Sequence, residues 1–242
     1  MSGENSSLAG SAYSVVRQRI VRGDLPIGKV ISRRKIAGEL GMSFLPVSEA
    51  LLRLEFEGLL ESRPRAGTRV RIPTRQDVKG HYVLREALEV HAAKLFAEAA
   101  TPDERAEMMK LALRVDTAAA QSGANRLLYP TLHAKLHRRI AECARCPKLS
   151  EAIEQTHALS STWLCVSPRP ASGKPIIRHQ ELIQALCGGN PEIAGETMRE
   201  HIAHSLQHAL ARLEPFFRMR KTMGSSYSRN PKKRVSKSSP AE

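Results

Sequence analysis

The chain of 242 residues carries 38 Lys and Arg against 24 Asp and Glu, which gives a formal net charge of +14 at pH 7, and 41% of its residues are hydrophobic. This hydrophobic content excludes a mainly disordered chain, and the length leaves room for two domains that each have a core. A strong positive charge favours a polyanionic partner such as nucleic acid.

The positive charge is concentrated at the two ends of the chain. Residues 1–75 hold 13 Lys and Arg against 7 Asp and Glu, and residues 218–242 hold 8 against 1. Residues 76–217 are nearly neutral, with 17 against 16. We therefore expect a nucleic-acid-binding surface near the ends of the chain and a different role for its middle.

The sequence carries no signal for a membrane span, for secretion or for a disulfide framework. No apolar run approaches the roughly 20 residues that a spanning helix needs. The first residues, MSGENSSLAGSAYS, have neither a basic start nor an apolar core. The four cysteines, of which Cys143 and Cys146 form a C-x-x-C without a second pair at zinc-ribbon spacing, are read as reduced thiols. We expect a cytoplasmic protein with no membrane partner.

Residues 11–75 predict a small domain of helices and a hairpin, after a polar and disordered start over residues 1–10. Apolar spacing and capping residues predict helices over residues 10–22, 33–40 and 43–57. Two short strands follow around a turn, over residues 59–63 and 69–72. This order is typical of a winged helix-turn-helix, which lays a helix in the major groove of DNA.

The residues expected to contact DNA lie at the starts of the second and third helices and on the wing. In such a module the start of the third helix faces base edges, while the preceding helix and the wing reach phosphates. The candidates are Arg33, Arg34, Lys35, Ser43, Phe44, Pro46, Ser48, Arg53, Arg63, Arg65, Gly67 and Thr68. The alternative is a solvated basic face on a winged helix that binds protein.

The middle of the chain, residues 76–217, predicts an all-α bundle. Six helices are expected, over residues 77–99, 102–120, 125–145, 148–165, 175–187 and 190–216. The fold class is therefore mainly α, with the winged helix-turn-helix first and the bundle second. Residues 218–242 have no apolar period and are rich in Ser, Lys and Arg, which predicts a disordered basic tail that adds non-specific DNA affinity.

Four of the nine histidines are expected to meet inside the bundle. His133 and His137 are spaced i and i+4, so they project from one face of one helix, beside its apolar stripe. His179 and His201 lie among apolar residues of two other helices. Four imidazoles suit zinc, or nickel or another borderline divalent metal. The alternative is ordinary hydrogen-bonded histidines. His204 and His208 are read as surface or interface residues, and His81, His91 and His157 are given no role.

Several short elements between residues 13 and 72 match a known pattern. They are Ile20-Val-Arg-Gly-Asp-Leu-Pro-Ile-Gly28, Arg34-Lys-Ile-Ala37, Leu40-Gly-Met-Ser43, Pro46-Val47, Glu49-Ala-Leu51, Arg53-Leu54, Glu57-Gly-Leu59 and Gly67. Together they resemble the DNA-binding domain of the GntR family of bacterial transcription regulators. The family places arginines where this chain has Phe44 and Ser48. We therefore expect an operator that depends less on guanine at this point, with Phe44 against a thymine methyl and Ser48 bonded to a phosphate or base.

The helical half also resembles a known domain. The matching pieces are Leu84-Arg85-x-x-Leu88-Glu89, Leu136-His137-x-x-Ile140-Ala141, Arg178-His179-x-x-Leu182-x-x-Ala185-Leu186 and Met198-x-x-His201-Ile202. They resemble the FCD ligand-binding domain of the FadR-like branch of that family. The resemblance implies a metal on His137, His179 and His201, with His133 in place of the usual aspartate. It also implies Arg85 as an effector anchor, although Arg85 could equally pair with Glu89 four residues on.

These resemblances imply a ligand-responsive regulator that is not an enzyme. A homodimer would read a palindromic operator in double-stranded DNA, and a small organic acid bound at the metal would release it, as expected of a repressor. An imidazole at position 133 leaves the metal charge uncompensated and so favours an anionic effector. Two alternatives stay open: a DNA-binding protein whose helical domain only dimerises, and a metal-dependent enzyme. Against the enzyme, the sequence brings no carboxylate base near the histidines.

Overall fold

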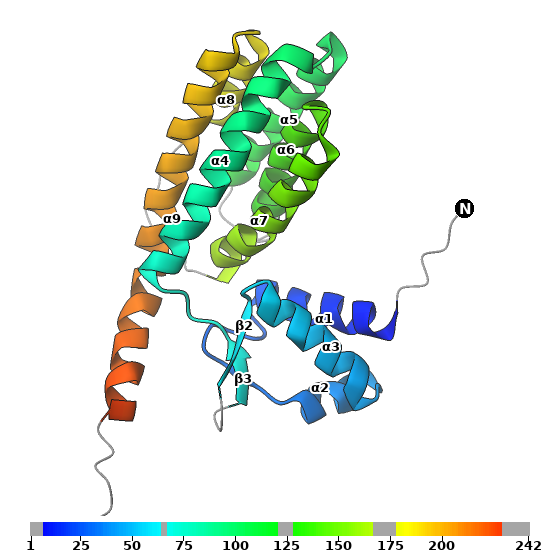
Figure 1. Ribbon diagram of the computed structural model, residues 1–242, viewed down its shortest axis with the longest axis vertical. Helices are drawn as coiled ribbons and strands as arrows, with labels where there is room; N and C mark the ends of the chain where they lie inside the picture. Colours follow the sequence, from blue (N-terminus) through cyan, green and yellow to red (C-terminus); the bar gives the residue numbers. More distant parts are fainter. Residues whose placement is uncertain (1–6, 64–66, 121–127, 167–177, 229–242) are drawn as a thin grey trace, which may run out of the picture.

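The computed structural model describes residues 7–63, 67–120, 128–166 and 178–228. Within these ranges the chain forms nine α-helices and three short strands. Figure 1 shows two parts, a bundle of long helices and, below it, a smaller unit built from the N-terminal helices and the sheet. No helix in the described ranges is long and apolar enough to cross a membrane.

The N-terminal unit holds three helices, α1 (Leu8–Arg22), α2 (Arg33–Leu40) and α3 (Phe44–Phe56). The side chain of Ser32 caps α2 by accepting a hydrogen bond from the backbone N–H of Lys35. Gly41 then takes a φ of 62°, a left-handed conformation that favours glycine, and turns the chain into α3. Fully buried residues of α1 and α3 meet in the core between these helices, namely Val16, Ile20, Val47, Leu51 and Leu54.

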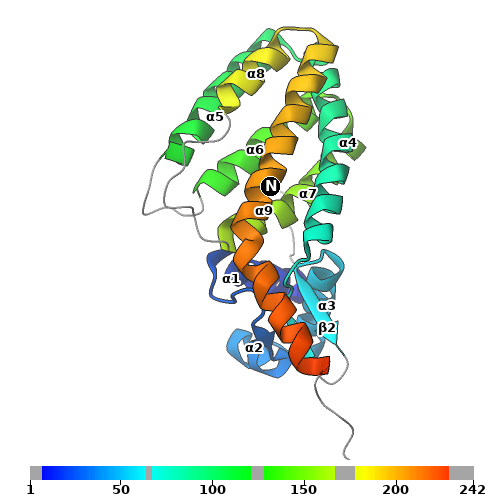
Figure 2. The same cartoon turned by 90° about the vertical axis from the view of Figure 1, so that its left-hand side faces the viewer.

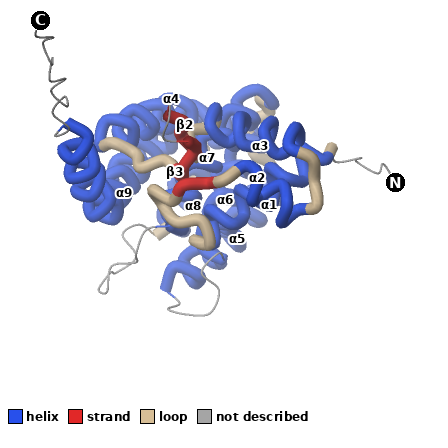
Figure 3. The backbone as a smooth tube through the Cα atoms, turned by 90° about the horizontal axis from the view of Figure 1, so that it is seen from below, coloured by secondary structure: helices blue, strands red, loops and turns tan. Residues whose placement is uncertain are grey.

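A three-stranded antiparallel sheet completes this unit, with β1 (Val30–Ile31), β2 (Leu60–Arg63) and β3 (Gly67–Val70) in the order β1-β3-β2. The hairpin β2–β3 is the predicted wing. The strand β1 was not expected from the sequence, because two residues are too few to show an alternating pattern. Seen from below, the strands lie between α9 and the N-terminal helices (Figure 3).

The helical bundle contains α4 (Arg75–Ala99), α5 (Pro102–Ala120), α6 (Leu128–Cys143), α7 (Pro147–Val166), α8 (His179–Cys187) and α9 (Pro191–Ser228). Thr74 and Asp77 form a capping box that starts α4 directly after the wing. The long helices α4 and α9 run side by side, as Figures 1 and 2 both show. The core between the helices includes Phe96, Met108, Leu136, Ile140 and Leu182, which are all buried.

The ends of the predicted elements need two corrections. The chain is helical from Leu8 and not disordered up to residue 10, because Ser7 caps α1 by accepting a hydrogen bond from the backbone N–H of Gly10. The helix α9 runs to Ser228 and not only to residue 216, so the first part of the predicted disordered tail is helical. Other predicted segments fall outside the described residues, namely the wing turn at 64–66, the loop at 167–173 and the end of the tail at 229–242.

Candidate metal centre and DNA-binding surface

The helix α6 turns His133 and His137 into the bundle. Both side chains are buried, and their Nε2 atoms lie 3.2 Å apart. The i, i+4 spacing places them one above the other on the apolar face, beside the buried Leu136 and Ile140.

The first residue of α8, His179, and a residue near the start of α9, His201, complete a four-histidine cluster. The ring centroids of these two lie 5.2 Å apart, and His201 is also 5.2 Å from His137. One nitrogen from each of the four imidazoles lies within 4.8 Å of the other three. The structure therefore brings together all four histidines that the sequence singled out.

The cluster leaves buried nitrogens without hydrogen-bond partners among the described residues. They include Nε2 of His179 and both ring nitrogens of His201. Buried polar atoms without partners are costly and rare in folded proteins. A divalent cation among the four rings would accept the lone pair of Nε2 of His179 and that of one ring nitrogen of His201, so the residues present fit a metal on their donor chemistry and on the unpaired atoms.

Two carboxylates lie behind the histidines. Asp116 of α5 accepts a hydrogen bond from Nδ1 of His179 at 2.8 Å, and Oε2 of Glu89 in α4 lies 2.5 Å from Nδ1 of His137. A carboxylate behind a metal-binding histidine holds the proton on Nδ1 and leaves Nε2 free for the metal. The expectation that no carboxylate lies near the histidines is therefore wrong, and these carboxylates would compensate part of the charge of a bound metal. Both carboxylates come from other helices, which the spacing of the histidines cannot reveal.

The carboxylate of Glu89 is the centre of a buried ionic network. Its Oε1 lies 2.7 Å from Nε of Arg85 and 3.1 Å from Nε2 of His157, and Arg85 and Glu89 are only 1% and 2% exposed. Burial alone would raise the pKa of Glu89, but the positive charge of Arg85, with His157 and His137, holds that pKa well below its usual value. The carboxylate is therefore ionised and paired.

This network bears on two sequence predictions. The pair of Arg85 with Glu89 is the alternative that the i, i+4 spacing left open, while a role for Arg85 as effector anchor stays a prediction. His157, which had no predicted role, lies in α7 with its ring centroid 4.6 Å from that of His137. Its spacing of four from the buried Ile153 was the available sign of an inward position.

Burial keeps three of the four clustered histidines neutral. It lowers the pKa of His137 to about 3 and holds the pKa values of His133 and His201 well below the usual range, an effect to which the neighbouring imidazoles add. Neutral imidazole is the form that binds a metal.

The predicted DNA-contacting residues divide into exposed and buried groups. Phe44, at the start of α3, is 53% exposed, and Ser43, Arg34 and Lys35 are exposed as well, while Pro46 is half-buried. Ser48, in contrast, is only 8% exposed, and its buried hydroxyl has no hydrogen-bond partner among the described residues. The expected contact of Ser48 with DNA is therefore not supported, because the position faces the core of the unit.

The wing shows a similar division. Thr68 is buried and bonds to Ser62 at 2.9 Å, so it supports the wing instead of facing outward. Arg33, at the start of α2, reaches this hydroxyl at 3.4 Å. The exposed Arg63 and Gly67 line a shallow hollow with Arg33. Basic side chains around a hollow on a wing suit a phosphate.

Two further arginines complete the set of predicted DNA contacts. Arg53 turns toward α1, because its guanidinium lies 4.1 Å from the ring centre of Tyr13 and its Nε bonds to Glu57 at 3.2 Å. Arg65 lies outside the described residues. Contacts with DNA at the exposed positions stay a prediction.

Two family models match the chain. Residues 8–70 match the family described as "Bacterial regulatory proteins, gntR family", and residues 81–204 match the family described as "FCD domain". The chain is a GntR-family transcription regulator with an FCD domain. The family and the fold class expected from the sequence are thereby confirmed. The relatives of this GntR regulator are transcription regulators, so it is not an enzyme.

Named relatives of this GntR regulator agree with the assignment. It is 29% identical to a probable D-xylose utilization operon transcriptional repressor of Paenarthrobacter nicotinovorans, over 82% of this chain and 87% of that protein. It is 32% identical to an uncharacterized HTH-type transcriptional regulator of Agrobacterium vitis, over 60% of this chain and 86% of that protein.

Solved structures share the fold of this GntR regulator. A putative transcriptional regulator GntR from Rhodococcus sp. RHA1 superposes with a TM-score of 0.69 at 22% identity, covering 85% of this chain and 98% of that one. McbR/YncC of E. coli superposes with a TM-score of 0.63 at 24% identity, covering 86% of this chain and 98% of that one.

Proposed function

We propose that this GntR regulator is a metal-dependent sensor of a small organic acid. A divalent metal would be held by His133, His137, His179 and His201. The observation that carries the proposal is the convergence of these buried imidazoles from α6, α8 and α9 within 4.8 Å of one another. A donor set of neutral nitrogens favours zinc, with nickel or another borderline metal as the next choice. When bound, the metal would supply positive charge for the carboxylate of the effector.

The charges around the cluster support an anionic effector. Asp116 and Glu89 each bring a negative charge behind a histidine, and Arg85 neutralises that of Glu89. A divalent metal would therefore leave a surplus of positive charge in a buried site, which one carboxylate could neutralise. For Arg85 to anchor that carboxylate directly, its guanidinium would have to exchange Glu89 for the effector.

The proposed regulation is repression by a homodimer in the cytoplasm. The relative from Paenarthrobacter nicotinovorans is named a repressor, and winged helices that act as a two-fold pair read two half-sites of a palindromic operator. Binding of the effector would change the placement of the winged helices and release the operator.

Two helices connect the histidines with the winged helix. The helix α9 carries His201 and, further along, Arg220, whose guanidinium donates a hydrogen bond to the carbonyl of Ile72 directly after the wing. The helix α4 begins at Arg75, which pairs with Glu214 of α9. A change at the histidines can therefore reach the DNA-binding unit through packed helices, which is the physical route that coupling between two sites requires.

Metal content is the first test. The wild-type protein purified without added chelator should carry a stoichiometric divalent metal by elemental analysis, and His133→Ala and His201→Ala should lose most of it while keeping their helical circular dichroism. His204→Ala is the matched control, because His204 is an exposed histidine on the same helix as His201. Equal metal content in all four proteins would refute the proposed ligand set.

The effector is the second test. A thermal-shift screen of small organic acids should find acids that stabilise the metal-loaded protein and not the chelator-treated protein. An effector at 100 times its dissociation constant stabilises by about 2.7 kcal/mol. An acid that stabilises the metal-free protein equally well would show that the effector does not bind at the metal. If no acid stabilises a protein that does carry metal, the helical domain serves only for dimerisation.

A further inference from the structure

The helix α7 is joined to the four-histidine cluster through His157. Nε2 of His157 lies 3.1 Å from Oε1 of Glu89, whose other carboxylate oxygen lies 2.5 Å from Nδ1 of His137. The rings of His157 and His137 also stack, with their centroids 4.6 Å apart and their planes at 28°. All three side chains are buried. A displacement of His137 therefore reaches α7 in two ways, through the shared carboxylate and through the ring contact.

The opposite side of α7 meets the DNA-binding unit. A methyl group added at Gly58, which lies between α3 and β2, would be 3.8 Å from Cδ2 of Leu159, so Leu159 packs on this glycine. His157 and Leu159 are two residues apart, which advances an α-helix by about 3 Å and turns it by roughly 200°. Their side chains thus leave α7 on opposite sides. The helix also contacts α1, and Figures 1 and 2 show its lower end beside that helix.

The backbone at Gly58 forms the junction between α3 and the wing, residues 57–59. Gly58 has a φ of 78°, a left-handed conformation that favours glycine, and the N–H of Leu59 donates to the carbonyl of Leu54 at 2.9 Å. Because Gly58 has no side chain, Leu159 lies directly against the backbone that turns α3 into β2. A shift of Leu159 therefore acts on the angle between α3 and the wing.

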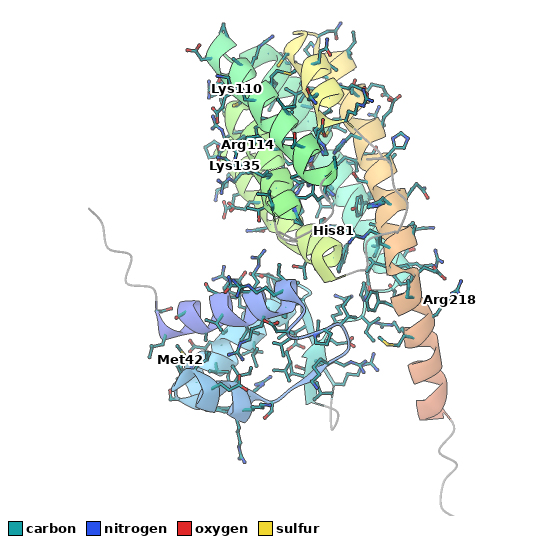
Figure 4. The ribbon with its side chains drawn as sticks, turned by 180° about the vertical axis from the view of Figure 1, so that it is seen from behind. Met42, His81, Lys110, Arg114, Lys135 and Arg218 are labelled. Carbon is teal, nitrogen blue, oxygen red and sulfur yellow. The ribbon has the colours of Figure 1, made fainter. Side chains whose placement is uncertain are left out.

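The same part of α7 is attached to α4. The hydroxyl of Ser160 lies 2.7 Å from Nε2 of His81, and the ring of Trp163 meets that of His81 edge-on, with their centroids 5.0 Å apart. Figure 4 labels His81 at the end of the bundle that faces the N-terminal unit. Trp163 is the only tryptophan of the chain and lies one helical turn after Leu159. Its fluorescence therefore reports on the position of α7 close to the junction.

We propose that α7 is a regulatory link between the metal centre and the junction of α3 with the wing. This inference rests on the proposed metal centre. Metal binding fixes the ring of His137, the shared carboxylate of Glu89 moves His157 with it, and α7 carries the displacement to Leu159 on its opposite side. The contacts of α9 and α4 place the winged helix as a whole, whereas α7 acts inside this unit.

The test uses the full chain with zinc alone or with a chelator, and a duplex that carries one half-site of an operator selected in vitro. A single half-site removes any contribution from the spacing between two winged helices. Zinc should change the emission of Trp163 in the wild-type protein. It should also change the affinity for the half-site by about fivefold, the lower end of the usual range for couplings between sites.

Variants at the two sides of α7 separate its contacts. Leu159→Ala should bind zinc and change its Trp163 emission as the wild type does, but should lose most of the zinc-dependent change in half-site affinity. Leu149→Ala is the matched control, because Leu149 is also a half-buried leucine of α7 but lies in its first turn, ten residues away. It should behave as the wild type in all three measurements.

His157 is tested as a positioning residue by two substitutions. His157→Leu should lose most of both responses to zinc, in Trp163 emission and in half-site affinity, while still binding zinc. In His157→Gln the amide NH2 can again donate a hydrogen bond to Glu89, so this variant should recover part of both responses. A merely structural role for His157 would give no such recovery at equal zinc content.

Two outcomes would overturn the proposal and leave the metal centre intact. A wild-type protein that binds zinc without any change in Trp163 emission would show that α7 does not respond to the metal. A Leu159→Ala variant with the wild-type response in half-site affinity would show that the contact with Gly58 transmits nothing. A wild-type protein that binds no zinc would instead refute the metal centre, and the link with it.

Discussion

The carboxylate of Asp116 accepts hydrogen bonds from both the ring Nδ1 and the backbone N–H of His179, at 2.8 and 2.9 Å. The preceding residue, Arg178, provides no side-chain cap for α8. One carboxylate from α5 therefore both starts the helix α8 and orients the imidazole at its first position. This arrangement makes Asp116 a positioning residue for the proposed metal centre.

Asp116→Asn should weaken metal binding about 10- to 100-fold, the usual effect of altering a partner behind a metal ligand. The amide oxygen can still accept from the backbone of His179, but the amide NH2 no longer fixes the proton on Nδ1. Competition with a chromophoric chelator measures the affinity. Asp103→Asn, an exposed position in the first turn of the same helix, is the control and should leave affinity unchanged. A normal affinity in Asp116→Asn would contradict the assigned role.

The metal-free protein should lose stability as pH falls below about 6.5, where histidine titrates in an unfolded chain. The pKa of His137 in the folded state is about 3, and those of His133 and His201 are also lowered. Because the folded pKa values are lower, the unfolded state binds more protons below pH 6.5, and each histidine lowers the free energy of unfolding by about 1.4 kcal/mol per pH unit. Above that pH these groups contribute no slope. Urea unfolding between about pH 8 and about pH 5 measures this, and a flat profile would contradict it.

Replacing only one residue of the buried pair Arg85 and Glu89 should lower the free energy of unfolding more than replacing both. Arg85→Met leaves the carboxylate of Glu89 buried with only imidazoles beside it, which should lower the free energy of unfolding by about 3–5 kcal/mol. The double variant Arg85→Met with Glu89→Leu restores an apolar pair and should be more stable than Arg85→Met alone. Urea unfolding of the metal-free proteins measures both. A double variant that is less stable than the single one would show that Glu89 is held mainly by its histidines.

Arg75→Ala should uncouple metal binding from DNA binding. This change removes the contacts of Arg75 with Glu214 and Phe217, which tie α9 to the start of α4. Couplings between sites are usually about 5- to 150-fold in affinity, and most of the metal-dependent change in operator affinity should disappear, while metal affinity itself stays normal. Arg199→Ala is the control, because Arg199 joins the same two helices through Glu86 at an exposed position away from the wing. An unchanged coupling in Arg75→Ala would exclude this route.

Phe44→Arg should introduce a preference for guanine under the start of α3. Phe44 is exposed at this position, where an arginine would bond the guanine edge and discriminate by about 1–3 kcal/mol. In vitro selection of operators with the wild-type and variant proteins measures the change. Leu52→Arg, which adds the same charge at an exposed position later in α3, is the control. An invariant guanine already present in sites selected by the wild-type protein would contradict the expectation.

Local spacing was enough to predict most helices and the inward pair of His133 and His137, because an i, i+4 pair beside an apolar stripe has one possible orientation in an amphipathic helix. It could not predict Asp116, Glu89 and His157, which reach the histidines from other helices. Their positions depend on the packing of the bundle, and a polar residue in a mostly apolar stripe is compatible with several roles.

The predicted DNA-contacting residues show a second limit of prediction from the sequence. The predictions for Ser48 and Thr68 came from their places in a recognisable module, yet both side chains are buried. The extension of α9 was missed for the opposite reason. Its sequence is mostly polar after Phe217, and the contacts that support it are made with Ile72 after the wing and with Gly28 before β1 instead of with the bundle.

Because α9 is long, a small tilt near the histidines would become a larger displacement at the wing. From His201 to Arg220 the helix spans about 28 Å at ~1.5 Å per residue, so a tilt of ~5° at the histidines would move the far end by roughly 2.5 Å. Pro215 lies between these two points and lacks the backbone N–H that would bridge one turn to the next. In the proposed sensor, a bend at Pro215 would change how much of a tilt reaches the wing, and substitutions there would alter the coupling between the histidines and the DNA-binding unit without changing the residues of either site.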